Sequence, residues 1–397
     1  MKVLFINTVY GQGSTGRIVA DLGKMLEENG HEFKVAYGRG DHSADPHCYR
    51  VGTDLDMYIH AGLSRITDRA GFYSTAATKK LVGFIREYAP DIIHLHNLHG
   101  YYVNIEVLFS YLADEYKGRV IWTLHDCWPF TGHCVHFTYA GCDKWKTHCS
   151  NCIQKGEYPA SMMLDNSYGN YEKKKELFTR VKNLEIITVS NWLKSVAEQS
   201  YLGGKKIRTI YNGVDTDRFH FVPNEIKKEL GIEDKKMILL VSDGWIEQKG
   251  YSTVLAVAKA APPDWQFVII GLTKEQISEL PTNITGFERI WNQDKLIEFY
   301  SAADVFFNPS LEETFGLVTA EAMACGTPAV VMNSTACPEL ITDKNAGTVV
   351  ARDTAAEVLV NSLSAVLNSG KKTMLPAVFS RNSFLKHYMD LYHLGDI

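Results

Sequence analysis

The chain has 397 residues, a length that fits two domains of ordinary size better than a single core. Its formal charge of -5, with 22% charged and 45% hydrophobic residues, provides no basic field and so argues against nucleic-acid binding. No stretch reaches the roughly 18 apolar residues that a membrane helix needs, which argues against a membrane-spanning protein.

The chain begins with an apolar run, Val3 to Ile6, that is too short for the core of a signal peptide. We therefore expect a buried first strand and a cytoplasmic protein. Further short apolar runs alternate with helix-length amphipathic stretches, which predicts an α/β fold of parallel strands joined by crossover helices. In the first half, strands are expected at 3–8, 33–37, 91–96, 120–125, 185–189 and 206–210.

The same alternation restarts after a turn-like cluster at 211–215, so the sequence predicts a second domain of similar design. We expect a first domain over 1–211 and a second over 212–379, with a helix over 380–397 that crosses back to the first. Strands of the second domain are expected at 237–242, 266–270, 305–308 and 329–332, and its helices at 250–261, 294–303, 316–325 and 354–368.

Two stretches of the first domain interrupt the alternation. Residues 42–73 are polar, and residues 126–167 show no clear strand or helix pattern. Loops longer than about 15 residues usually carry a function or their own internal support.

A glycine loop follows the first strand. Gly11, Gly13 and Gly16 match the spacing G-x-G-x-x-G, and such a loop presents backbone N–H groups and a helix dipole to an anion. Glycines are also what any tight strand-to-helix turn requires, so both interpretations stay open. A dinucleotide-binding dehydrogenase would need an acid at the end of the second strand, and Tyr37 to Gly40 contain none.

The most informative stretch is residues 308–328, NPSLEETFGLVTAEAMACGTP. A predicted strand ends at Asn308, Glu313 follows on a loop, and a helix starting near Gly316 carries Glu321. Free amides at that helix start can meet a phosphate while the two carboxylates accept hydrogen bonds from hydroxyls on either side of it. A nucleotide sugar has this layout. The alternatives are a first-turn acid that the helix dipole favours and a carboxylate on a solvated helix face.

With these motifs the chain resembles glycosyltransferase family 4, whose members are retaining enzymes with the GT-B fold of two Rossmann-like domains facing across a cleft. Glu313 and Glu321, spaced E-x7-E within EETFGLVTAEAMACGTP, match its signature. Further segments match in the same order: DIIHLH (91–96), TLHD (123–126), VSNW (189–192), YNGVD (211–215) and QKG (248–250). The resemblance covers nearly the whole chain. Trp245 and the cysteine-bearing segment after His125 are most similar to the branch that includes a colanic-acid biosynthesis enzyme.

The resemblance implies donor-binding roles in the second domain. Glu313 would contact the donor-sugar hydroxyls, Glu321 the ribose hydroxyls, and Lys249 the diphosphate. Three backbone amides would approach the same diphosphate, those of Phe315, Gly316 and Leu317. Family members commonly have an arginine a few residues before the lysine, whereas residues 242–245 read SDGW without a cation. Either Lys249 and the helix dipole suffice, or another cation such as Arg17 or Arg289 takes its place.

In the first domain, the resemblance implies that His125 lines the cleft beside the reacting sugar and belongs with Lys249 and Glu313 to the catalytic set. A lone histidine after a strand is more often structural, but the matching context of TLHD favours a functional role. Gly13 and Gly16 would approach the phosphate or the acceptor. Three further histidines are expected to be structural or to line the cleft: His94, His96 and His99.

The function implied is transfer of a hexose from a UDP- or GDP-sugar to a glycan or lipid-linked acceptor in surface polysaccharide biosynthesis, with peripheral contact at the inner membrane face. Lys249 and the helix start at Gly316 would stabilise the departing diphosphate without a catalytic metal or cofactor. A nucleotide-sugar epimerase or phosphorylase on the same fold is the alternative enzyme. A zinc-supported interaction protein is the non-enzymatic alternative, and it leaves the glutamate pair unexplained.

Four of the eight cysteines lie within one short segment, with the spacing C-x7-C-x6-C-x2-C: Cys134, Cys142, Cys149 and Cys152. Four thiolates so placed are suited to one tetrahedral structural zinc ion, which would support a long loop. The alternative is reduced, unconnected thiols, as is usual in the cytosol. Three histidines nearby are further candidate ligands: His133, His136 and His148.

Overall fold

The computed structural model describes residues 1–42, 44–342, 346–370 and 372–394, and it divides into two compact units. Unit 1 contains residues 1–210 and the C-terminal segment from Leu385, and unit 2 is Tyr211–Phe384. The sequence placed the domain boundary after residue 211 and the start of the returning segment at residue 380. The end of that predicted helix, 395–397, lies outside the described residues.

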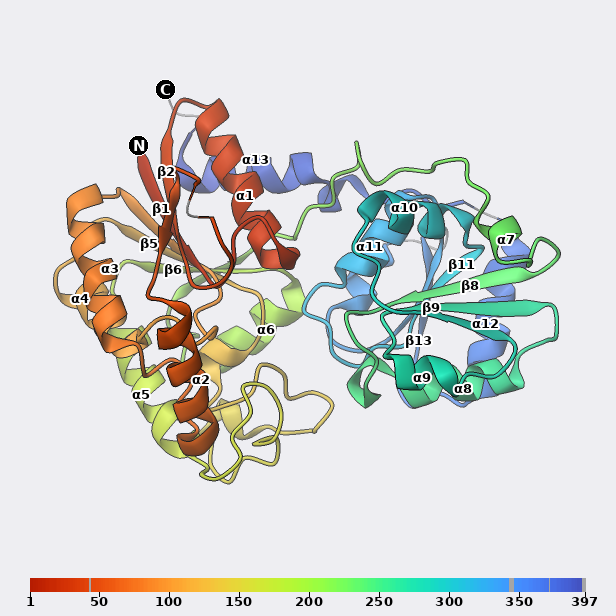
Figure 1. Ribbon diagram of the computed structural model, residues 1–397, viewed down its shortest axis with the longest axis horizontal. Helices are drawn as coiled ribbons and strands as arrows, with labels where there is room; N and C mark the ends of the chain where they lie inside the picture. The colour runs from red at the N-terminus through yellow and green to blue at the C-terminus, as the bar shows by residue number, and fades with distance from the viewer. Residues whose placement is uncertain (43, 343–345, 371, 395–397) are drawn as a thin grey trace. The chain divides into compact units, whose positions relative to one another are not determined.

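Unit 1 contains a parallel sheet of seven strands within the described residues, in the order β3-β2-β1-β4-β5-β6-β7, flanked by helices (Figure 1). Its strands are β1 (Lys2–Asn7), β2 (Glu32–Tyr37), β3 (Cys48–Arg50), β4 (Ile92–Leu95), β5 (Arg119–Leu124), β6 (Leu184–Thr188) and β7 (Lys206–Thr209). Its helices are α1 (Gly13–Glu28), α2 (Asp54–Thr67), α3 (Thr75–Tyr88), α4 (Ile105–Asp114), α5 (Ser167–Arg180) and α6 (Asn191–Gln199).

Unit 2 repeats the design with a parallel sheet of six strands in its described part, in the order β10-β9-β8-β11-β12-β13. Its strands are β8 (Lys236–Val241), β9 (Trp265–Ile270), β10 (Ile284–Phe287), β11 (Val305–Asn308), β12 (Ala329–Met332) and β13 (Gly347–Val350). Its helices are α7 (Ile226–Glu229), α8 (Tyr251–Ala260), α9 (Lys274–Ser278), α10 (Gln293–Ala302), α11 (Leu317–Ala324) and α12 (Ala356–Ser369). The predicted α/β fold is confirmed in both units.

The central strands are apolar on both faces because helices cover both sides of a parallel sheet. β5, β8 and β9 are buried along nearly their whole length. The strands that the sequence pattern did not reveal are β3, β10 and β13, and each lies at the edge of its sheet. Edge strands are partly exposed and therefore lack a continuous apolar run.

The two irregular stretches differ from each other. Residues 42–73, expected to be a polar interruption of the alternation, contain β3 and helix α2, which begins with a capping box between Thr53 and Asp56. Residues 126–166 contain only two short 3-10 helices, η1 (Trp128–Phe130) and η2 (Lys144–Lys146).

The last helix, α13 (Arg381–Tyr392), has buried tyrosines that join it to the sheet of unit 1. The hydroxyl of Tyr392 lies 2.6 Å from Nδ1 of His94 in β4. The hydroxyl of Tyr388 lies 2.8 Å from Oγ1 of Thr123 in β5, and the same hydroxyl oxygen of Thr123 lies 2.8 Å from Nε2 of His94. This buried network explains why the end of the chain belongs to unit 1.

Candidate functional site

The strand order of both sheets reverses at their first strand, β1 in unit 1 and β8 in unit 2. In open parallel sheets, ligands bind outside the carboxyl ends of the strands at such a reversal. The loops after β8 and β11 are therefore the expected binding edge of unit 2, and those after β1 and β4 the expected edge of unit 1.

At the edge of unit 2, Lys249 and Glu313 form an ion pair. The 3-10 helix η3 (Glu247–Lys249) precedes α8, and Nζ of Lys249 lies 2.7 Å from Oε1 of Glu313 in the loop after β11. The same ammonium donates to the carbonyl of Glu312 at 3.0 Å. The side chains of Lys249 and Glu313 keep 28% and 20% of their surface exposed, so a ligand can reach both.

The backbone holds these two loops together. The N–H of Leu311 donates to the carbonyl of Gln248 at 2.9 Å. Gly250 has φ +79°, and a Cβ there would lie 2.7 Å from the carbonyl oxygen of Pro309. Only glycine permits this conformation and this close approach, which brings Lys249 against the loop of Glu313.

The carboxylate of Glu313 strongly affects Lys249. Burial lowers the pKa of Lys249, but the charge of Glu313 and its hydrogen bond raise it by more, so the pKa lies above its ordinary value. Lys249 is consequently a permanent cation at neutral pH. A fixed cation beside a carboxylate suits a ligand that presents both an anion and hydroxyl groups.

Helix α11 begins directly after this loop. Its N-cap is Gly316, with φ +94° and no side-chain cap hydrogen bond, so the first-turn amides are not covered by a capping side chain. Phe315 is buried, and Leu317 is the first, half-buried residue of the helix. An uncapped helix start is a favourable site for a phosphate.

Glu321 lies one turn further along α11 and is 8% exposed. Its Oε2 accepts a hydrogen bond of 3.0 Å from the hydroxyl of Tyr300 in α10. Glu321 therefore does not lie on a solvated helix face. A buried carboxylate needs hydrogen-bond donors, and the hydroxyls of a ribose are suitable donors for it.

The place of the missing arginine is occupied by an ion pair. Asp243, in the loop after β8, pairs with Arg289, which follows β10. The guanidinium of Arg289 also lies 3.9 Å from the ring centre of Trp291. Arg289 is thus at the binding edge of unit 2, whereas Arg17 lies exposed on α1 of unit 1.

At the edge of unit 1, the glycines form a tight turn into α1. Gly13 has φ +61° and is the first residue of the helix, and the N–H of Gly11 donates to the carbonyl of Gly16 at 3.0 Å. A Cβ on Gly16 would lie 3.2 Å from the backbone of Tyr10 and Gly11. Turn geometry alone therefore requires these glycines, and the exposed amides at Gly13 remain open to an anion.

His125, directly after β5, belongs to a group of histidines with His94 in β4 and His96 directly after it. Its Nε2 lies 2.9 Å from Nδ1 of His96, and the two rings are stacked with centres 5.3 Å apart. The ring of His94 packs against that of His96, with ring centres 4.3 Å apart. Burial lowers the pKa of His125 to about 4, and it also lowers the pKa values of His94 and His96. At neutral pH the stack is uncharged.

Asp126 forms the charged member of this edge. Its Oδ2 lies 2.6 Å from Nε2 of His99, and its Oδ1 accepts from the N–H of Trp128. Burial raises the pKa of Asp126, but His99 and the N–H group lower it by more, so the carboxylate stays ionised.

Several residues of these edges were not found from the sequence. Thr335 follows β12 and accepts the N–H of Glu313 at 2.9 Å, and Asn308 donates to Thr319 of α11 at 3.0 Å. Asn308 ends a strand, which is a usable signal. Tyr300 and Thr335 carry no local signal because only the order of strands and helices brings them to the glutamates.

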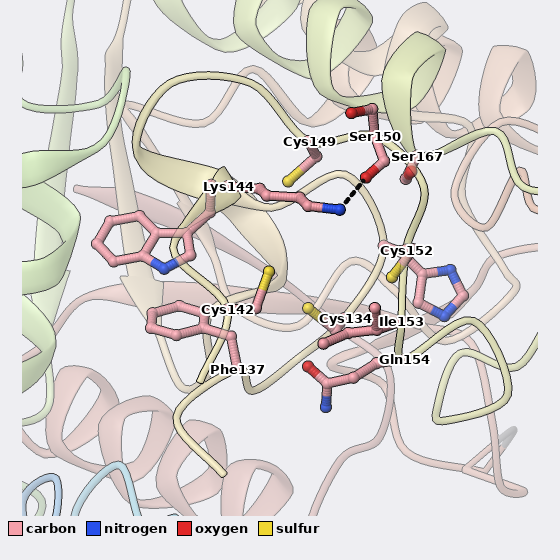
Figure 2. Close-up of a pocket in the computed structure, with 12 residues that line it drawn as sticks. Cys134, Phe137, Cys142, Lys144, Cys149, Ser150, Cys152, Ile153, Gln154 and Ser167 are labelled. Atoms are coloured by element: carbon pink, nitrogen blue, oxygen red, sulfur yellow. Dashed lines mark hydrogen bonds between the residues drawn. The ribbon is translucent and has the colours of Figure 1, made fainter. Parts of the chain in front are cut away.

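The four predicted zinc ligands lie in unit 1, where all four line one small cavity (Figure 2). Among the described residues, no three His, Cys, Asp or Glu side chains are already gathered to hold a metal ion.

Comparison with known proteins identifies the family of the chain. The family model "Glycosyltransferase Family 4" matches residues 15–218, and "Glycosyl transferases group 1" matches residues 223–383. The chain is 23% identical over 414 residues to a putative colanic acid biosynthesis glycosyl transferase, WcaC, of Escherichia coli (strain K12), and the match covers 99% of each chain.

Two solved structures are similar over both units. Sucrose-phosphate synthase from Thermosynechococcus elongatus has a TM-score of 0.70 at 17% identity, covering 99% of this chain and 98% of that one. Anabaena HepE in complex with UDP-glucose has a TM-score of 0.66 at 15% identity, covering 99% of each. These likenesses confirm the GT-B type of fold. The chain therefore belongs to glycosyltransferase family 4, a group related to enzymes of polysaccharide biosynthesis.

Proposed function

We propose that the protein transfers a hexose from a UDP- or GDP-sugar to a glycan or lipid-linked acceptor, with retention at the anomeric carbon. The ion pair between Lys249 and Glu313 beside the uncapped start of α11 carries this proposal. In it, Lys249 and the amides of 315–317 bind the diphosphate, and Glu313 accepts from sugar hydroxyls. The HepE structure holds UDP-glucose, which supports a nucleotide-sugar donor.

Glu321 completes the proposed donor site by accepting from the ribose hydroxyls. Binding of the ribose would replace or extend its present hydrogen bond from Tyr300. Arg289 supplies the second positive charge that residues 242–245 lack, after release from Asp243. Arg17, an exposed side chain of unit 1, is the other candidate.

In the reaction, the bond between the anomeric carbon and the diphosphate oxygen breaks, and an acceptor oxygen forms a bond to the same face of that carbon. The acceptor proton passes to the departing diphosphate. Negative charge grows on the diphosphate as the bond breaks, and Lys249 and the α11 amides are already aimed at it. Because these groups supply the positive charge that balances the departing diphosphate, we expect a chelator of divalent cations to leave the transfer rate unchanged.

His125 is proposed to act as a positioning group or hydrogen-bond partner beside the reacting sugar. Its pKa of about 4 keeps it neutral, so it can donate one hydrogen bond and accept another. Gly13 and Gly16 place the exposed start of α1 for contact with a phosphate or with the acceptor.

The first test is thermal stabilisation by a panel of nucleotides and nucleotide sugars. A ligand at 100 times its dissociation constant stabilises the folded state by about 2.7 kcal/mol. We expect UDP or GDP and one sugar conjugate to stabilise the wild type, and to stabilise Lys249→Ala and Glu321→Ala much less. The control is Lys259→Ala, at an exposed lysine of α8, which should be stabilised as much as the wild type. The proposal fails if no nucleotide at millimolar concentration shifts the wild type.

A second measurement separates a transferase from an epimerase or phosphorylase. Release of UDP or GDP that depends on an added glycan or lipid-linked acceptor supports a transferase. Conversion of the sugar without release of nucleotide supports an epimerase, and release that depends on inorganic phosphate supports a phosphorylase.

We propose further that the protein works in the cytoplasm in peripheral contact with the inner membrane face. Helix α2 exposes Leu55, Tyr58, Ile59 and Ile66. The segment of Met162 to Leu164 is hydrogen-bonded alongside it, to the carbonyls of residues 65 and 66, and exposes three more apolar side chains. In the part of the chain that the structure describes, no helix is both long and apolar enough to cross a bilayer.

Exposed arginines at residues 65 and 69 lie at the same end of α2, and such a mixture of apolar and basic groups suits an anionic lipid surface. We expect the wild type to sediment with vesicles containing phosphatidylglycerol. The double variant Ile59→Ser and Met162→Ser should sediment with them less. Equal sedimentation of both proteins would contradict this contact.

A further inference from the structure

The cysteine segment is a compact part of unit 1 with very little regular secondary structure. Between β5 and α5 it contains only η1 and η2. Its aromatic side chains form a small core, in which Phe137 stacks on Trp145 with ring centres 4.5 Å apart and Phe130 packs edge-on against Trp145. A segment of about this length needs support beyond a few aromatic contacts.

One cavity of about 20 Å³ lies inside this segment, and the cysteines surround it (Figure 2). All four cysteines of the segment contribute to its lining, together with Phe137 and Trp145. The thiols of Cys134 and Cys152 are close enough to share a hydrogen bond. This volume has room for about one small ion or water molecule.

The nearby histidines have other partners. His133 pairs with the buried carboxylate of Asp68, and Nε2 of His148 lies 3.0 Å from Oε1 of Glu172. The structure thus separates the candidate ligands that the sequence left mixed. The four cysteines line one cavity. His133 also lines it, but its ring and that of His148 are paired with carboxylates.

Lys144 lines the cavity, and Lys174 lies near two of its cysteines. Nζ of Lys144 donates to the carbonyls of Ser150 and Asn151, which lie between Cys149 and Cys152 and form the turn of the C-x2-C pair. Lys174 is 1% exposed, lies within electrostatic range of Cys149 and Cys134, and donates to the carbonyls of Trp128 and Thr131.

We propose that Cys134, Cys142, Cys149 and Cys152 bind one structural zinc ion in this cavity. Each thiol releases its proton to solvent, and the four thiolates with Zn²⁺ carry a net charge of minus two, which Lys144 and Lys174 offset. Because the thiols are not yet gathered to hold an ion, their side chains turn inward on binding. Rotation about χ1 moves a sulfur atom without moving the backbone.

The zinc ion joins both ends of the segment that follows β5, and so holds the residues next to His125 and Asp126 in place. This site does not depend on the proposed donor site in unit 2. Loss of zinc therefore lowers the stability of unit 1 and leaves nucleotide binding by Lys249 and Glu321 intact.

The test is elemental analysis of the full chain, expressed with added zinc and purified under reducing conditions. We expect about one zinc per chain in the wild type and in Cys48→Ser, a half-buried cysteine of β3 outside the segment. The double variant Cys149→Ser and Cys152→Ser is expected to contain no zinc. A wild type without stoichiometric zinc overturns the proposal, as does equal loss of zinc from the Cys48 variant.

If the double variant does not fold, cobalt substitution of the wild type decides. Co²⁺ bound by four thiolates in tetrahedral geometry gives intense sulfur-to-cobalt charge-transfer absorption, which supports the site. Octahedral cobalt spectra, or a disulfide between Cys134 and Cys152 in protein isolated from the cytosol, overturn it.

Discussion

The two sheets reverse their strand order at the same point, the first strand, but their carboxyl edges carry different side chains. In unit 2, Lys249 and Glu313 are charged, partly exposed and paired at 2.7 Å beside an uncapped helix start. In unit 1, the stack that contains His96 and His125 is uncharged because burial lowers both pKa values. Two edges of similar Rossmann-like design can thus carry an exposed ion pair in one unit and a buried neutral histidine stack in the other.

The largest expected effect comes from removing the fixed cation of unit 2. Lys249→Ala should lower the transfer rate about 100- to 1000-fold, because it removes a charge aimed at the departing diphosphate. The measurement is kcat/KM for the donor identified by thermal stabilisation. Lys259→Ala should keep the wild-type value, and an equal loss in both variants would remove Lys249 from the proposed machinery.

The next effect concerns acid stability of unit 1. His60 is buried, accepts the N–H of Gly71 at Nε2, and has its pKa lowered from 6.5 to about 3 by burial. Below pH 6.5 this histidine is therefore protonated in the unfolded chain but not in the folded chain. The free energy of unfolding falls as the pH falls. Between pH 6.5 and pH 5 this costs about 2 kcal/mol.

Urea unfolding at pH 7 and pH 5 checks this linkage. His60→Asn should lose about 2 kcal/mol less than the wild type between the two pH values. His220→Asn, an exposed histidine of unit 2, should lose as much as the wild type. Identical losses in all three proteins would show that His60 does not resist protonation.

A smaller effect is expected for the neutral histidine of unit 1. His125→Ala should lower kcat about tenfold, the value of about one lost hydrogen bond, while the nucleotide affinity of unit 2 stays unchanged. Because the pKa of His125 is about 4, protonation of this residue should not reduce kcat between pH 7 and pH 5. An acid limb near pH 6.5 that disappears in His125→Ala would contradict the neutral stack.

The smallest effect tests how the last helix is held. Tyr392→Phe removes the buried hydrogen bond between the tyrosine hydroxyl and His94, and should cost about 1 kcal/mol in unfolding free energy. Tyr58→Phe, at an exposed position of α2, should cost nothing measurable. Nucleotide affinity should not change in either variant. A reduced affinity in Tyr392→Phe would mean that this network also supports unit 2.

Much of the fold could be predicted because its signals are local. The apolar runs of β1, β5, β8 and β9 are continuous in sequence. Glu313 in the loop before α11 and Glu321 within α11 lie within nine residues of each other. The edge strand β3 and helix α2 were missed, although the spacing of Thr53 and Asp56 is a capping-box signal. Partial exposure had removed the apolar pattern there.

By itself, the sequence determined the α/β alternation, the restart of the pattern near residue 211 and the local order of Glu313, Gly316 and Glu321. Each depends on residues a few positions apart, and strand alternation and helix hydrogen bonds act over that range. Only the tertiary structure decided that Lys249 meets Glu313, 64 positions away, and that His94 meets Tyr392, 298 positions away. Such pairs depend on strand order and burial, which residue spacing along the chain does not encode.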